Sequence, residues 1–222
     1  MRSRPGARCS PIPTAWGIRS QPNYLALFSG STQGVSDDRC PYAFTTPNLA
    51  SELIAAGLSF GGYSESLAAV GSSACRAPDG YARRHNPWSD FTNVPAEVSM
   101  PFTSFPTEYS QLPTVSMVVP NVRNDMHGGT MLRADAWLRD QLDGYVQWAL
   151  SHNSLFIITW DEASGNHIPT IFVGPMVQPG QYAERIDHYR VLRSIEEMYD
   201  LPPLGQTAEG EPILDVWLPA TP

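Results

Sequence analysis

The chain has 222 residues, 42% hydrophobic and 16% charged, so it is long enough for one sizeable core and too short for two comfortable domains. Its 14 basic and 22 acidic residues give a net charge of −8, the wrong sign for general attraction to nucleic acid or an anionic membrane. No segment reaches the roughly 18 apolar residues that a stable membrane insertion needs. We expect one globular domain that holds an anionic substrate in a local site.

The N-terminal segment differs in character from the rest of the chain. Residues 1–19 are rich in Arg, Pro and Ser and lack periodicity, so we expect an irregular leader ahead of a domain formed by residues 20–222. The leader has no apolar run before a small-residue cleavage site and is not predicted to be a signal peptide. The stretch after it, with Pro22 in a first turn and Gly30 as a terminator, predicts a short buried helix.

Residues 46–64 predict a helix followed by a strand, because apolar positions at helical spacing end at Gly57 and a β-type run follows. Residues 71–112 contain many prolines and aromatics without a steady period. We expect a long loop there, and long ordered loops usually carry function or form a lid.

The second half alternates strands and helices. Residues 113–120 and 154–160 are apolar runs typical of strands buried on both faces, and residues 168–174 form another such run. Residues 133–152 predict an amphipathic helix, and residues 187–200 a helix whose first residue is its N-cap. The pattern predicts an α/β fold, a three-layer α/β/α sandwich with a mostly parallel sheet. Ligands of such sheets bind at the carboxyl ends of the strands.

Candidate site residues follow two of these strands. Asp161 and Glu162 come directly after residues 154–160, and two carboxylates together suit a hard cation, although a turn cap and a solvated acid fit equally well. His127 stands in "NDMHGGT", where two glycines allow the backbone to turn closely around a ligand. His85 lies in the long loop within the most cationic stretch, suited to an anion. Both histidines are equally compatible with ordinary loop positions.

Ser20 begins the first predicted helix, where free N–H groups and the helix dipole stabilise an anion and a hydroxyl nucleophile would meet phosphate. An ordinary N-cap serine is the alternative interpretation. His152 and His188 lie at helix ends and are interpreted as structural, while His167 stays ambiguous.

The three cysteines match no metal-binding spacing, which argues against a zinc finger. Cys40 and Cys75 both lie in turn-rich stretches. A disulfide between them, with Cys9 left unpaired, and three free thiols both remain open, since the first requires an oxidising compartment.

Six segments in this order resemble the bacterial acid phosphatase and phospholipase C-type phosphoesterase family of the alkaline phosphatase-like superfamily. The resemblance runs from about residue 20 to the C-terminus. The segments are "SQPNYLALFSGSTQGVSDDRCP", "NLASELIAAGLSFGGYSESL", "YARRHNPWSDF", "PTVSMVVPNVRNDMHGGT", "SLFIITWDE" and "IPTIFVGPMV".

The resemblance implies a catalytic site. In the family, the hydroxyl residue just ahead of a Pro-Asn pair is the nucleophile that forms a covalent phospho-enzyme, and that position here is Ser20. The consecutive acids Asp161 and Glu162 correspond to ligands of a divalent metal ion, whose identity the sequence does not name, with Ser20 as a further ligand. His85 and His127 correspond to histidines that contact the phosphoryl group, and such groups stabilise its oxygens or protonate the leaving group.

The asparagine of the Pro-Asn pair, Asn23, is expected to join the substrate contacts. Family members also begin with a strand that ends in a Glu-Asn pair at the metal site, and this chain contains no Glu-Asn pair. The resemblance therefore implies an N-terminally truncated member that lacks the first strand. We expect unpaired neighbouring strands, marginal stability and weak activity. Relatives are often exported to the cell envelope or beyond.

Several functions stay open at this stage. The first is metal-dependent hydrolysis of phosphate monoesters of a small substrate through phospho-Ser20, with a phospholipase C acting on diesters as its variant. The second is an impaired or dead remnant that binds phosphate-like anions. A serine hydrolase of the nucleophile-elbow type is disfavoured, because the chain has no Gly-x-Ser-x-Gly motif.

Overall fold

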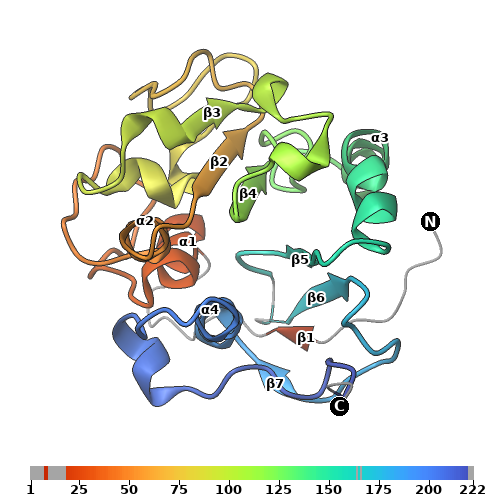
Figure 1. Ribbon diagram of the computed structural model, residues 1–222. Helices are drawn as coiled ribbons and strands as arrows, with labels where there is room; N and C mark the ends of the chain where they lie inside the picture. Colours follow the sequence, from red (N-terminus) through yellow and green to blue (C-terminus); the bar gives the residue numbers. More distant parts are fainter. Residues whose placement is uncertain (1–7, 10–18, 164, 166, 220–222) are drawn as a thin grey trace.

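The computed structural model describes residues 8–9, 19–163, 165 and 167–219 and has the predicted α/β architecture (Figure 1). Its helices are α1 (Ser20–Ser29), α2 (Leu49–Ala55), α3 (Met131–Ala149) and α4 (His188–Met198). Its strands are β1 (Arg8–Cys9), β2 (Phe60–Ser64), β3 (Ser99–Pro101), β4 (Val115–Val119), β5 (Phe156–Thr159), β6 (Ile168–Val173) and β7 (Arg185–Ile186).

The strands form two groups between layers of helix. β2 lies between β3 and β4, and both of these pairings are parallel. The second group has the order β5-β6-β1-β7, in which β6 runs antiparallel to β5 and β1, while β1 runs parallel to β7. Parallel pairings therefore predominate among the described strands, as predicted. Figure 1 shows α1, α2 and α4 on one side of the strands and α3 on the other.

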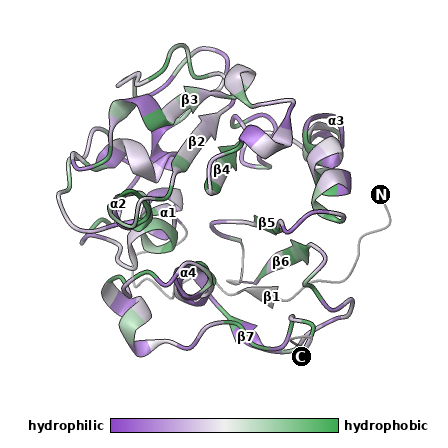
Figure 2. Cartoon of the chain, in the orientation of Figure 1, coloured by the Kyte–Doolittle hydropathy of each residue, from purple (hydrophilic) through white to green (hydrophobic). Residues whose placement is uncertain are grey.

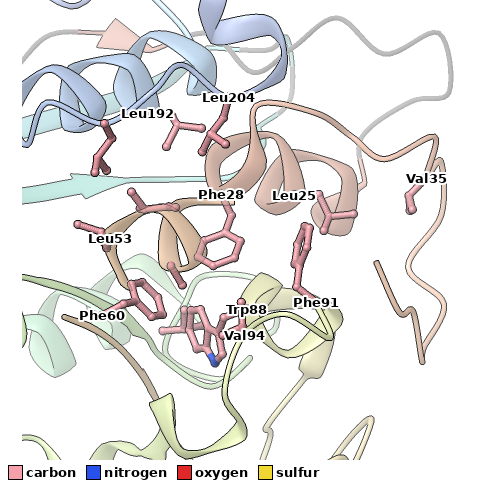
Figure 3. Packing of buried hydrophobic residues seen from close by; sticks show 14 residues of the cluster. Leu25, Phe28, Val35, Leu53, Phe60, Trp88, Phe91, Val94, Leu192 and Leu204 are labelled. Atoms are coloured by element: carbon pink, nitrogen blue, oxygen red, sulfur yellow. The ribbon is translucent and has the colours of Figure 1, made fainter. Parts of the chain in front are cut away.

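Helix α1 is anchored in the main core. Leu25 and Phe28 are fully buried, and the ring of Phe28 lies 5.5 Å from that of Phe60 and 5.6 Å from that of Phe91 (Figure 3). Burial of each such side chain stabilises the fold by about 1.5–3 kcal/mol. The helix ends at Gly30, whose φ of 64° is left-handed, as the sequence predicts. The first residue of α1 is therefore held on a rigid element.

A second core lies around β6 and joins the first through α4. Ile168 and Phe172 of β6 pack with Val191 of α4 in this second cluster. The next residue of α4, Leu192, is fully buried in the main cluster. The side chain of Asp187 caps α4 by accepting a hydrogen bond from the backbone N–H of Arg190, which confirms the predicted N-cap. One helix thus fixes the positions of both groups of strands.

Strands β4 and β5 are hydrophobic (Figure 2), but burial on both faces, predicted for each, is wrong. Only Val119 of β4 is buried, and all residues of β5 are half-buried. Within the described ranges, β4 pairs only with β2 and β5 only with β6, so each keeps one edge without a strand.

Other elements differ from their predictions. The predicted loop 71–112 contains β3, which pairs with β2, together with short 3-10 turns. On the apolar face of α3, Leu142, Val146 and Ala149 are buried, while Trp137, Leu138 and Tyr145 are half-buried. Residues 8–9 of the predicted leader form β1, and its residues 1–7 and 10–18 lie outside the described part. The domain boundary at residue 20 stays a prediction.

The long loop is cross-linked to the segment after α1. A disulfide joins Cys40 and Cys75 with an S–S distance of 2.06 Å, so the paired alternative is confirmed. No helix in the described part combines the length and the apolar character needed to cross a membrane.

Candidate active site

Ser20 does not cap α1, so the N-cap interpretation is wrong. The N-cap is Arg19, without a side-chain capping bond, and Ser20 is the first helical residue. Its side chain is buried, and its hydroxyl donates a hydrogen bond to Oε1 of Glu162 at 3.4 Å, across 142 residues of sequence. The structure therefore brings the predicted nucleophile and one predicted metal ligand together.

Asp161 and Glu162 follow β5 and carry unsatisfied oxygens. Oδ2 of Asp161 and Oε2 of Glu162 are buried and find no hydrogen-bond partner among the described residues. Burial, and then the negative charge of Asp161, raise the pKa of Glu162 to about 7. Buried carboxylate oxygens without partners are costly, so this pair is suited to bind a positive charge.

Whether these residues fit the metal ion that the family implies depends on the donor set. Two orphaned carboxylate oxygens and the hydroxyl of Ser20 are hard ligands of the type that divalent cations prefer. Across the residues that the structure describes, no group of three or more His, Cys, Asp or Glu is arranged to hold a metal. The present side chains fit a cation, and they supply a partial set of ligands.

His85 is buried within a 3-10 turn at Arg83–His85, in the long loop. Its Nδ1 lies 3.1 Å from Oδ2 of Asp125, without hydrogen-bond alignment. The ring stacks on Tyr24 of α1 at 5.2 Å, and its buried Nε2 has no partner in the described ranges. The contacts fix one face and one edge of the imidazole and leave Nε2 available to a ligand.

His127 is exposed and lies near His85, with 5.8 Å between the ring centroids. Arg84 donates from Nη2 to Nε2 of His127 at 3.2 Å, which requires a neutral imidazole with its proton on Nδ1. The backbone N–H of His127 donates to Oδ1 of Asp125 at 2.8 Å, so one carboxylate contacts both histidine segments. The predicted convergence of the two histidines is present.

The glycines after His127 close their own loop and do not make room for a ligand. A Cβ on Gly128 would lie 2.9 Å from the carbonyl oxygen of Val122, and one on Gly129 would lie 1.9 Å from that of Arg123. The expectation that this backbone wraps a ligand therefore finds no support in the geometry, because the close neighbours are carbonyls of the same loop.

The remaining candidates have other surroundings. Asn23 donates from Nδ2 to the carbonyl of Arg19 at 2.8 Å and keeps a buried Oδ1 without a described partner. His152 stacks on Trp148 at the end of α3, as expected of a structural residue, and His167 is exposed.

Sequence reasoning assigned neither Tyr24 nor His188 to this region, and the structure places both beside it. Tyr24 stands four residues after Ser20, hence on the same face of α1, a spacing that could have indicated it. Burial, and then the charges of Asp161 and Asp125, raise the pKa of its phenol. His188 is fully buried, and its Nε2 donates to the backbone carbonyl of Asp161 at 2.8 Å. No local signal in the sequence indicates that contact.

The family model described as Phosphoesterase family matches residues 15–202. The chain belongs to the phosphoesterase family. The match covers all the site residues described above, from Ser20 to His188, and it confirms the resemblance found in the sequence. Both partners of the Ser20–Glu162 hydrogen bond therefore lie within the part of the chain that matches the family.

Curated relatives carry phosphatase names. A phosphatidylinositol-3-phosphatase of Mycobacterium tuberculosis is 50% identical over 204 residues, which cover 89% of this chain and 68% of the relative. A probable acid phosphatase of Kluyveromyces lactis is 28% identical over 226 residues, 91% of this chain and 53% of the relative. A phosphate-repressible acid phosphatase of Penicillium chrysogenum is 27% identical over 216 residues, 88% and 52%.

The chain thus spans about two thirds of the mycobacterial phosphatase and about half of each fungal one. Family and relatives together place this phosphoesterase among the hydrolases that act on phosphate esters.

Proposed function

We propose that the chain hydrolyses phosphate monoesters through a phospho-Ser20 intermediate. The observation that carries the proposal is the buried Ser20 hydroxyl, which opens α1 and donates to Glu162 at 3.4 Å. The dipole at a helix start stabilises a phosphoryl group there. The phosphatase names of the relatives favour monoesters over the diesters of a phospholipase C.

In the first step, Oγ of Ser20 bonds to phosphorus and its proton passes to Glu162, which accepts the hydrogen bond of this hydroxyl. The ester P–O bond breaks, and its electron pair leaves with the alcohol oxygen. Glu162 releases the proton to solvent, and the proton donor recovers one from solvent before the next turnover. We assign the proton donor to His85, because Asp125 lies beside its Nδ1 and its Nε2 has no partner among the described residues. Arg84 and His127 would contact the phosphoryl oxygens. Water then attacks phosphorus and releases Ser20, whose hydroxyl is restored by a proton from that water.

A divalent cation is part of this proposal. Held by Asp161, Glu162 and Ser20, it would neutralise phosphate charge and lower the pKa of the serine hydroxyl. Support comes from the two orphaned carboxylate oxygens. The disulfide further supports an oxidising compartment, and hence export, for this protein.

The test is hydrolysis of a chromogenic phosphate monoester, with and without divalent metals, by the parent chain and Ser20→Ala. Ser29→Ala is the matched control, because its buried hydroxyl lies on the same helix and donates to the carbonyl of Leu25. We expect metal-dependent turnover in the parent and control, loss in Ser20→Ala, and a phosphate adduct on Ser20 after acid quench. Parent-like rates in Ser20→Ala would refute the phospho-serine mechanism.

A catalytically impaired remnant is the second candidate. It is favoured by the partial ligand set, since the described residues hold no group of three metal-binding side chains. Background rates in the parent at every metal tested, together with binding of orthovanadate without metal, would support it. Binding of vanadate and metal together would argue for the active enzyme.

A further inference from the structure

We propose that a pocket beside the candidate active site binds a second anionic group of the substrate, such as another phosphate or a phosphodiester. This inference rests on the proposed phosphatase function and names the class of substrate. The pocket has a volume of about 230 Å³, enough for a phosphate group with bound water. It is lined by Asp38, Arg39, Cys40, Cys75, Arg76 and Arg84.

The lining is cationic in an acidic chain. It holds three arginines against one aspartate, whereas the whole chain carries a net charge of −8. Arg39 is paired with Asp37, but Arg76 makes no side-chain hydrogen bond or ion pair within the part of the chain that the structure describes. Nε of Arg84 is buried and has no described partner. Guanidinium groups with unused donors are suited to bind phosphate oxygens in pairs.

Two residues that line the pocket also contact the region of the candidate active site. Arg84 reaches His127 at 3.2 Å, so its guanidinium lies between the pocket and the histidine pair. Asp38 accepts a hydrogen bond from the backbone N–H of Gln21 at 3.0 Å, and Gln21 is the neighbour of Ser20. A ligand whose phosphate contacts Ser20 can therefore place a second anion in the pocket.

The disulfide holds the cationic side chains together. Arg39 and Arg76 adjoin Cys40 and Cys75, whose Cα atoms are 5.8 Å apart although 35 residues separate them in sequence. Two exposed arginines from different loops are thus presented at one place. This preorganisation reduces the entropy lost when an anion binds.

The experiment compares phosphate release from inositol 1-phosphate and inositol 1,3-bisphosphate. The pocket variant is Arg39→Ala/Arg76→Ala, and the control is Arg139→Ala/Arg185→Ala, which removes the same charge from two exposed arginines elsewhere. We expect the parent to prefer the bisphosphate, and the ratio of kcat/KM values to fall about tenfold in the pocket variant. The control should keep the parental ratio, and salt should weaken the preference.

A binding arm separates this inference from the proposed function. Calorimetric titration of both inositol phosphates into Ser20→Ala, with and without the pocket substitutions, needs no turnover. If the parent releases no phosphate, the proposed function fails, while a pocket-dependent affinity for the bisphosphate still supports the subsite. Equal affinities for the two inositol phosphates, or an equal ratio of kcat/KM values in the parent and the pocket variant, would overturn the proposed subsite. Binding to vesicles that contain phosphatidylinositol 3-phosphate shows whether the pocket binds a lipid headgroup more tightly than the soluble anion.

Discussion

Replacing Asp90 by Ala should destabilise the fold strongly, because it removes both a buried ion pair within the long loop and a buried hydrogen bond that ties this loop to α1. The side chains of Arg83 and Asp90 are 9% and 1% exposed, and Nε lies 3.1 Å from Oδ1. Oδ2 of Asp90 also accepts a hydrogen bond from Nε2 of Gln21 at 2.9 Å. The substitution leaves a buried guanidinium without its counter-charge and a buried amide donor without its acceptor.

The expected size follows from these surroundings. Removing one partner of a buried pair costs about 3–5 kcal/mol. Arg83 keeps its hydrogen bonds to the carbonyls of Ser73 and Ser89, so we expect the lower end, about 3 kcal/mol. Asp140→Ala is the matched control, because Asp140 pairs with Arg139 at 3.0 Å with side chains 59% and 53% exposed. The free energy of unfolding of this control should fall by less than about 1 kcal/mol.

Urea unfolding followed by circular dichroism measures both variants. With a slope of about 2–3 kcal/mol per molar, the midpoint of Asp90→Ala should fall by about 1 M, and that of Asp140→Ala by a few tenths. Equal shifts in the two variants would refute the reasoning, since burial is what distinguishes the pairs.

Three further predictions concern other parts of the chain. Because the folded pKa of Glu162 is about 7 against an ordinary 4.5, its contribution to stability is present below about pH 4.5 and is lost as pH rises through 7. In chelator, Glu162→Gln should therefore flatten the fall in Tm over that range, and an unchanged slope would contradict the assignment. Gly62→Ala places a Cβ 2.2 Å from Cε2 of Trp88 and should cost about 1–3 kcal/mol in urea unfolding, whereas Gly210→Ala, whose nearest neighbour is 3.7 Å away, should be almost neutral. Cys40→Ser/Cys75→Ser opens a cross-link over 35 residues and should cost about 4 kcal/mol. Reductant should lower the Tm of the parent and leave the Tm of this variant unchanged. A parent whose Tm is equally insensitive to reductant would argue that the disulfide does not contribute to stability.

Elements with their own local signal were predictable from the sequence. Helix α1 ends at Gly30 and α4 begins after its Asp187 cap, because capping chemistry is encoded within a few residues. Strand β3 was missed because three residues that end in proline carry little strand signal, and parallel pairing with β2 defines the strand. Short elements of this kind exist through their neighbours in space.

The burial of β4 and β5 shows a second limit. An apolar run indicates that the side chains of a strand can be buried. Whether they are buried depends on the strands at its edges and the helices on its faces. Val115 to Val118 stay half-buried in β4 although every residue of the strand except Ser116 is hydrophobic. Periodicity alone could not have revealed this, because it contains no information about the neighbouring strand.

The site itself divides in the same way. Ser20, Asp161 and Glu162 were candidates because each stands at the end of a regular element, and the structure brings Ser20 and Glu162 into contact. Asp125 and Arg84 were not assigned roles, since their contacts with His85 and His127 depend on the fold of the long loop. The sequence shows which residues are candidates for the site, and only the structure shows which of them contact one another.

His188 connects the packing of the core with the acids of the site. Burial lowers its pKa, so the imidazole stays neutral and Nε2 carries the proton that it donates to the carbonyl of Asp161. It begins α4, whose Val191 and Leu192 lie in different hydrophobic clusters. The hydrogen bond therefore fixes the backbone after β5 to the element that both cores hold in place. The direction of the Glu162 carboxylate toward Ser20 thus depends on packing remote from any substrate, and a structural histidine becomes a positioning residue.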